Sequence, residues 1–236
     1  MLVLALDTAT PRVSVALGDD GHVLAELQLA SGTDRGRGVR RHAELLAPGI
    51  ESLCAQAGAR VADVSAVAVG IGPGMFTGLR VGVTTAKVLA QVLQVPVVPV
   101  ASLDLVAHPL RHSVRLVVAV LDARRREVFT SRYRSEPGGL QRVSDYEVLP
   151  PVELVDDLAA AGEELLMAGD GVDRYRDDFA RLERAELAGA AFDAPSAVAL
   201  LELATARIAR GDVVGPDEVL PLYLRQSDAE ITWEHA

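Results

Sequence analysis

Residues 70–94 read GIGPGMFTGLRVGVTTAKVLAQVLQ, a glycine-rich turn followed by a long stretch whose single breaker is Gly82. The apolar run at 64–69 that precedes the turn has the composition of a buried strand. Glycine reaches backbone angles that other residues cannot, and proline ends regular pairing, so the glycines around Pro73 predict a tight exit from this strand. Thr77 is a suitable N-cap, and we expect a helix over 78–94.

The expected helix is unusual because apolar residues cover most of its sides. Its charged residues are Arg80 and Lys87. Small residues recur at every fourth position and form one smooth stripe: Gly78, Gly82, Ala86 and Ala90. A surface helix normally has one apolar stripe and a polar back, so this helix should be covered on more than one side. Two interpretations remain open, a central helix of one domain and a helix that faces a partner.

The same glycines also suggest a phosphate-binding loop, because a helix N-terminus after a glycine turn binds anions. The dinucleotide-binding motif, however, requires a third glycine where Met75 stands. The P-loop requires Lys-Ser or Lys-Thr after its last glycine, where this sequence has Leu79 and Arg80. Neither motif is present, so a nucleotide site here would have to follow the rules of another fold.

Composition and charge indicate an intracellular globular protein. The 236 residues are 50% hydrophobic, with no apolar run long enough for a membrane span and no basic region ahead of the apolar N-terminus. A single cysteine, Cys54, excludes an internal disulfide, and we expect a cytoplasmic protein. The net charge is −10; residues 1–105 carry 8 basic and 9 acidic side chains, whereas residues 106–236 carry 15 and 24. The acidic second half disfavours autonomous binding to nucleic acid.

The order of the expected elements occurs twice along the chain. We expect strands at 2–6, 13–17, 22–29, 64–69, 97–100, 116–121, 127–133, within 141–149, and at 165–169, and helices at 42–57, 78–94, 102–107, 151–160, 175–182 and 195–210. This repeat predicts a duplicated α/β fold with subdomains at 1–105 and 106–236 and a hinge near 101–110. The Gly- and Arg-rich segment 31–41 is expected to be a mobile loop.

Two motifs together carry a resemblance to a known family. The first is Asp7-Thr8 at the end of the first strand, and the second is Gly72-Pro73-Gly74-x-Phe76-Thr77-Gly78-x-Arg80. The pair resembles the bacterial TsaB (YeaZ) family, a degenerate paralogue of the TsaD (Gcp, Kae) proteins. His42-x-Glu44, Asp122-Ala123-Arg124 and Pro221-x-Tyr223-Leu224-Arg225 are similar to further family segments. Met75, where the family usually has Ser, and the longer 31–41 loop depart from the pattern.

The resemblance implies a fold and a function. The fold would be the duplicated actin, hexokinase and heat-shock-ATPase type (ribonuclease H-like), with a mixed sheet and helices in each subdomain. TsaB-like proteins help to form threonylcarbamoyladenosine beside the anticodon of tRNAs that read codons beginning with A. The chain would be a non-catalytic scaffold that pairs with the TsaD transferase, joins the ATPase TsaE, and reaches tRNA only through that complex. ATP or ADP and a metal would lie on the partners, and a homodimer is possible.

The chain's own chemistry points the same way. TsaD-like proteins carry a His-x-x-x-His pair where this sequence has Ser102 and Val106, which are not metal ligands. His108 and His112 have that spacing but lie six residues later around a proline, and we interpret them as exposed linker histidines. Cys54 lies on an apolar helix face and is interpreted as core filler. A metallopeptidase-like hydrolase and a sugar-kinase-like ATPase remain the alternative functions.

The site prediction therefore contains no catalytic, cofactor or metal residue of this chain. The expected partner interface lies on the two long helices of the first half and comprises His42, Leu45, Leu46, Ile50, Leu53, Gly78, Val81, Gly82, Thr85, Ala86, Leu89 and Ala90. Asp7 and Thr8 are expected to order their own turn by satisfying backbone amides. The basic run 124–126 is interpreted as a hairpin tip, with contact to a nucleotide or to RNA phosphate as the alternative.

Overall fold

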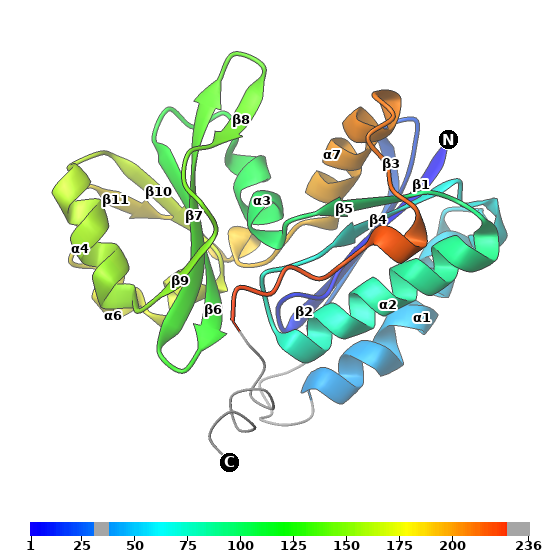
Figure 1. The fold of residues 1–236 in the computed structure, drawn as a ribbon, viewed down its shortest axis with the longest axis horizontal. Coiled ribbons are helices and arrows are strands. Elements are labelled where there is room, and N and C mark those ends of the chain that lie inside the picture. Colours follow the sequence, from blue (N-terminus) through cyan, green and yellow to red (C-terminus); the bar gives the residue numbers. More distant parts are fainter. Residues whose placement is uncertain (31–37, 226–236) are drawn as a thin grey trace.

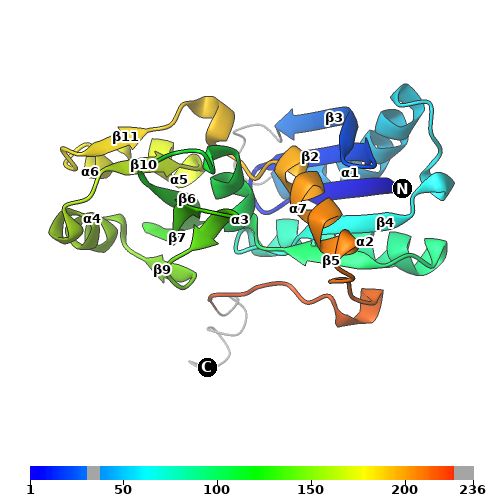
Figure 2. The same cartoon turned by 90° about the horizontal axis from the view of Figure 1, so that it is seen from above.

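The computed structural model describes residues 1–30 and 38–225, with side chains omitted at 38–43. It contains two mixed sheets that lie side by side along the long axis of the molecule (Figures 1 and 2). The first consists of β1 (Leu2–Asp7), β2 (Arg12–Asp19), β3 (His22–Ala30), β4 (Ala66–Gly70) and β5 (Val97–Val100). The second consists of β6 (Leu116–Arg124), β7 (Glu127–Glu136), β8 (Gly139–Arg142), β9 (Glu147–Leu149), β10 (Leu165–Ala168) and β11 (Ala185–Leu187).

The strand order confirms the duplicated α/β fold expected from the sequence. The first sheet has the order β3-β2-β1-β4-β5, and the second has the equivalent order β8-β7-β6-β10-β11. In each sheet the first strand of the repeat pairs antiparallel with the second and parallel with the fourth. The expected strand within 141–149 is two short strands, β8 and β9, which both pair with β7.

Helices cover both faces of the first sheet. Leu4 and Leu6 of β1 point to the face covered by α1 (Gly38–Gln56) and α2 (Phe76–Leu93). Val3 and Ala5 point to the opposite face, which is covered by α7 (Ala197–Ala209). Successive side chains of a strand point to opposite faces, so β1 supplies both cores at once. The helices α1 and α2 lie side by side on their face of the sheet (Figure 1).

The second sheet is covered in the same way by α4 (Pro151–Ala161), α5 (Asp170–Arg174) and α6 (Arg176–Phe179) on one face. Its other face packs against α3 (Ser102–Ala107), through Leu103 and Val106. The sheets thus exchange helices, because α3 follows the first sheet in sequence and α7 follows the second. If the sequence is divided at residue 105, α7 belongs to the second half. In the structure, however, the apolar face of α7 packs on the first sheet, against β1, β2, β4 and β5.

The chain after α7 returns across the first sheet and reaches the second. Val214 pairs with Val97, and Val219, which follows the 3-10 turn Pro216–Glu218, is buried in the core beneath α2. The Leu222 N–H donates to the carbonyl of Ile71 at 2.8 Å, and Leu224 packs against the α3-side core of the second sheet. This tail, residues 212–225, therefore touches both halves (Figure 1).

The structure corrects two expectations about α2. The helix begins at Phe76 after Met75 as N-cap, so the predicted start after Thr77 is wrong. The stripe of small residues was expected to be free for a partner, but Gly78, Gly82, Ala86 and Ala90 are all buried, and Ala86 has 0% of its surface exposed. A Cβ on Gly82 would lie 2.2 Å from Oγ1 of Thr8. The stripe exists because β1 and its loop approach α2 closely, and a charge at Ala86 or Ala90 would be buried.

We expect Gly82→Ala to lower the free energy of unfolding by about 1–3 kcal/mol, because the added methyl group displaces Thr8 from its hydrogen bond to the Gly78 carbonyl. Urea unfolding followed by circular dichroism measures the loss. Gly189→Ala is the matched control, since a Cβ there meets no atom within 4 Å, and it should stay within about 0.5 kcal/mol of the wild type. Equal stability of the two variants would contradict this packing of α2.

Candidate functional site

The loops that follow β1 and β4 meet the start of α3 around one buried carboxylate, that of Asp7. Its side chain is 1% exposed. Its Oδ1 accepts a hydrogen bond from the Ala9 N–H at 2.8 Å, and its Oδ2 accepts one from the Ser102 hydroxyl at 2.6 Å. The Ser102 oxygen in turn accepts from the Gly72 N–H at 3.1 Å. Asp7 therefore orders its own turn, as predicted, and also joins that turn to α3 and the glycine turn.

The glycine turn fits closely over the loop that contains Asp7. A Cβ on Gly70 would lie 1.8 Å from Oδ2 of Asp7, and one on Gly74 would lie 2.4 Å from the carbonyl oxygen of Ala9. The Met75 N–H donates to that same carbonyl at 2.8 Å. Only residues without a side chain allow this approach. The backbone of residues 74 and 75 therefore lies directly against the loop that follows β1.

Burial raises the pKa of Asp7 to about 6, and the hydrogen bonds from Ser102 and Ala9 partly oppose this change. Both carboxylate oxygens already accept a protein hydrogen bond. The groups that a metal would need are also missing nearby. Ser102 donates to Asp7, and Val106 is packed in the α3 core. Across residues 1–30 and 38–225, no group of three His, Cys, Asp or Glu side chains could hold a metal ion.

The second half places a related arrangement at the equivalent point of its sheet. Asp170, which follows β10, accepts a hydrogen bond from the Asp122 N–H near the end of β6 at 2.9 Å. Burial raises the pKa of Asp170 to about 6. The Asp122 carboxylate is within 3.1 Å of both Arg124 and Arg174. This pairing was not predicted from the sequence, although the strand-then-Asp pattern of Asp7 recurs at Asp122 and could have indicated it.

Other predicted residues behave as follows. Cys54 is buried in the core and burial raises the pKa of its thiol, which confirms its interpretation as core filler. His108 is not an exposed linker residue, because its Nε2 lies 2.9 Å from the Glu202 carboxylate on α7 and burial lowers the pKa of the ring. Thr77 is exposed and caps nothing, whereas the Phe76 ring lies between the Arg80 guanidinium at 4.3 Å and the Tyr223 ring at 5.2 Å.

The residues predicted for the partner interface divide into three groups. The buried ones pack on the chain's own sheet: Leu46, Ile50, Leu53, Gly78, Gly82, Ala86 and Ala90. The partly exposed ones lie at the helix flanks: Leu45, Val81, Thr85 and Leu89. His42 lies outside the residues whose side chains are described. The prediction omitted Val88 and Val92, which are 55% and 73% exposed on α2. Their four-residue spacing, on the side away from the small stripe, was the signal that could have identified them.

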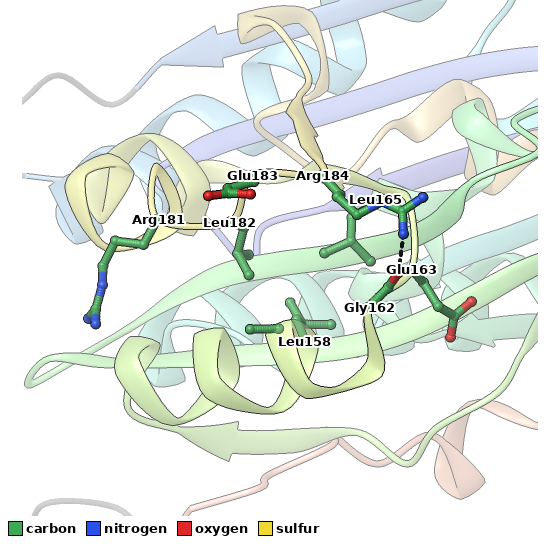
Figure 3. A pocket seen from close by; sticks show the side chains of 9 residues that line it. Leu158, Gly162, Glu163, Leu165, Arg181, Leu182, Glu183 and Arg184 are labelled. Carbon is green, nitrogen blue, oxygen red and sulfur yellow. Dashed lines mark hydrogen bonds between the residues drawn. The ribbon is translucent and has the colours of Figure 1, made fainter.

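A pocket of about 250 Å³ lies at the far end of the second sheet, between α4 and the segment after α6 (Figure 3). Its floor is apolar, formed by Leu158, Leu165 and Leu182. The Arg184 guanidinium beside it donates to the Gly162 carbonyl at 2.7 Å, as the dashed line in Figure 3 marks. The lining contains no serine, cysteine or histidine, and of its two carboxylates Glu163 is paired with Arg134.

Comparison of the sequence with known protein families and with characterised proteins identifies relatives of this chain. Residues 24–233 match the model of the family described as TsaD: tRNA N6-adenosine threonylcarbamoyltransferase. The chain is 31% identical over 244 residues to the tRNA threonylcarbamoyladenosine biosynthesis protein TsaB of Haemophilus influenzae, covering 99% of this chain and 96% of that protein. It is 29% identical over 232 residues to TsaB of Escherichia coli, covering 97% and 96% of the two chains.

Solved structures give the same result. YeaZ from Pseudomonas aeruginosa superposes with a TM-score of 0.78 at 33% identity, over 94% of this chain and 99% of that one. Component A of the Acidaminococcus fermentans (R)-2-hydroxyglutaryl-CoA dehydratase, at 11% identity and a TM-score of 0.51 over 89% and 99%, shares the fold alone. The family model that matches residues 24–233 and the TsaB relative that is 31% identical over nearly the full chain show that the chain belongs to the TsaB (YeaZ) family.

Proposed function

We propose that this chain is a non-catalytic scaffold subunit in the biosynthesis of threonylcarbamoyladenosine in tRNA. The relatives named TsaB carry that pathway in their names. The observation that supports a scaffold is the state of the loop around Asp7. Its carboxylate holds Ala9 and Ser102, and the glycine turn fills the space above it. A reacting group needs access to its substrate, and this one has almost none.

The surface that supports pairing is the exposed row on α2. Val88 and Val92 stand one helical turn apart and are largely exposed, and Val81, Thr85 and Leu89 continue the surface. The neighbouring helix α1 extends this face (Figure 1). Two long helices lying side by side offer ridges and grooves into which a similar pair can pack. We propose that a TsaD-like transferase binds here, which moves the predicted interface from the buried stripe to the opposite side of α2.

In this proposal the chain works with two partners that supply the chemistry. The TsaD-like subunit holds the metal and the nucleotide and transfers the group, and a TsaE-like ATPase joins the complex. A second copy of this chain could occupy the same helix face when the transferase is absent. The alternative functions, a metallopeptidase-like hydrolase and a sugar-kinase-like ATPase, each require a bound metal or a phosphate loop. Among the described residues, no group of three His, Cys, Asp or Glu side chains that could hold a metal supports the hydrolase.

We expect Val88→Glu combined with Val92→Glu to weaken binding of the TsaD-like partner by about 100-fold or more, because the centre of an apolar interface tolerates no unpaired charge. The fold should be retained, since both side chains are exposed. Size-exclusion chromatography of the mixed subunits, with circular dichroism of the variant, measures both results.

The matched control is Val152→Glu, a valine that is 41% exposed on α4 of the second half. It should assemble with the partner like the wild type. A double variant on α2 that is folded and still forms the heterodimer at wild-type affinity would place the interface elsewhere.

We expect Asp7→Asn to reduce stability rather than chemistry. The amide retains one acceptor for Ala9 but presents an N–H₂ group to Ser102, whose hydroxyl then loses its acceptor, at a cost of about 1–3 kcal/mol at neutral pH. The folded-state pKa of Asp7 is raised to about 6, above its unfolded value, so the folded protein takes up the proton first. The wild type should therefore gain stability relative to the variant as the pH falls from about 6 to about 4.

Urea unfolding across this pH range tests the effect, and Asp177→Asn, at an exposed aspartate on α6, serves as the control. Threonylcarbamoyladenosine formation in a reconstituted system should track the folded fraction of Asp7→Asn. A variant with an intact melting temperature and no tRNA modification would give Asp7 a chemical role and contradict the scaffold proposal.

A further inference from the structure

The tip of the β6–β7 hairpin consists of three consecutive arginines in the left-handed region of the backbone. Arg124, Arg125 and Arg126 have φ angles of 63°, 53° and 62°. Turns of this kind favour Gly, Asn or Asp, and a left-handed conformation costs other residues about 1 kcal/mol each. Arginine therefore does not stabilise this turn. Backbone strain of this sort is a reason to look for a role outside folding.

The hairpin tip meets the first half of the molecule at the start of α2. The Arg124 guanidinium contacts the sulfur of Met75 at 3.8 Å, and Met75 is the N-cap of α2. The tail joins the same place, because Arg225 pairs with Glu127 of β7 at 2.7 Å. The hairpin, the first turn of α2 and the end of the tail lie along one edge of the molecule (Figure 1).

Two aromatic rings pack against each other at this edge. The Phe76 ring packs at 5.2 Å against the Tyr223 ring, and the Arg80 guanidinium lies 4.3 Å from the centre of the Phe76 ring. Tyr223 is 42% exposed, and Arg80 is also exposed. We call Phe76, Arg80, Arg124, Arg126 and Tyr223 the arginine–aromatic edge.

The charges at this edge are not all neutralised. Arg124 and Arg174 both form an ion pair with the Asp122 carboxylate, and the Arg124 guanidinium therefore has an acidic partner. In contrast, within the part of the chain that the structure describes, neither Arg80 nor Arg126 forms an ion pair with a carboxylate. Arg80 lies over the Phe76 ring, whereas Arg126 lies at the hairpin tip and lines a hollow with residues 173–178. Two guanidinium groups without a carboxylate partner thus occur along this edge of a chain whose net charge is −10.

We propose that the arginine–aromatic edge contacts an unpaired RNA segment, with Arg80 and Arg126 on phosphates and Tyr223 stacked on a base. Proteins recognise unpaired RNA by stacking bases on aromatic rings and guanidinium planes while cations neutralise the backbone. This inference rests on the proposed function, in which the RNA is the tRNA of the complex. The acidic second half keeps the affinity of the isolated chain low, so the contact operates inside the assembled complex.

The test uses the complex of this chain with its TsaD-like and TsaE-like partners and an unmodified transcript of a tRNA that reads codons beginning with A. Fluorescence anisotropy over a salt series gives the Kd and its salt dependence. We expect Tyr223→Leu, which keeps an apolar contact with Phe76, to weaken tRNA binding about fivefold or more through loss of stacking. Arg126→Ala should weaken binding and reduce the slope of log K against log salt by about one.

Arg181→Ala, at the pocket on the far end of the second sheet, is the matched control and should change neither quantity. Size-exclusion chromatography establishes that every variant enters the complex. Assembled Tyr223→Leu and Arg126→Ala complexes with the wild-type Kd and salt slope would overturn this inference and leave the proposed function standing. A wild-type chain that neither assembles with a transferase nor supports modification would overturn both.

Discussion

The arrangement of the first half depends on the buried carboxylate of Asp7. It closes its own turn through Ala9 and reaches Ser102 at the start of the helix that crosses to the second sheet. The Ser102 hydroxyl oxygen in turn accepts a hydrogen bond from the backbone N–H of Gly72 in the glycine turn. One ionisable group thus links three segments that are far apart in sequence. Because that group is almost fully buried, its hydrogen bonds compensate for lost hydration, and they leave it little capacity for a substrate.

The glycine turn and α2 are shaped by the same constraint. Gly74 and Gly82 permit the loop after β1 to lie directly against the turn and the helix. The small residues of α2 are therefore explained by intramolecular packing, and Val88 and Val92 on the opposite side of the helix are exposed. A glycine turn followed by an apolar helix is a sequence pattern that suits both a phosphate-binding loop and a helix that binds a protein. The two cases differ in what fills the space between the turn, the helix and the loop that precedes them. Here Thr8 and the backbone of Ala9 fill it.

Much of the fold could be predicted from the sequence because local patterns decide it. Apolar runs bounded by turns identified most of the strands, and the boundaries of α3 were predicted without error. The predicted start of α2 was wrong because the Met75 N–H donates a hydrogen bond to the Ala9 carbonyl, and this contact joins segments that are distant in sequence. The prediction that the stripe of small residues faces a partner was wrong for a related reason. A helix that is apolar on most sides does not reveal which side meets its own sheet. The family was identified from two short motifs, whereas Val88, Val92 and the Asp122–Asp170 hydrogen bond were not predicted, although sequence patterns indicated them.

The exchange of α3 and α7 between the sheets has a consequence for synthesis of the chain. On the ribosome the strands of the first sheet emerge early, and α1 and α2 can cover one face as soon as they appear. The other face, with Val3, Ala5 and Val100, waits for α7, which begins at Ala197. An apolar sheet face is thus without its cover while about half of the polypeptide is still being made, which is the situation in which nascent chains attract chaperones. Completion of the first half coincides with completion of the second, so the two should become protease-resistant together.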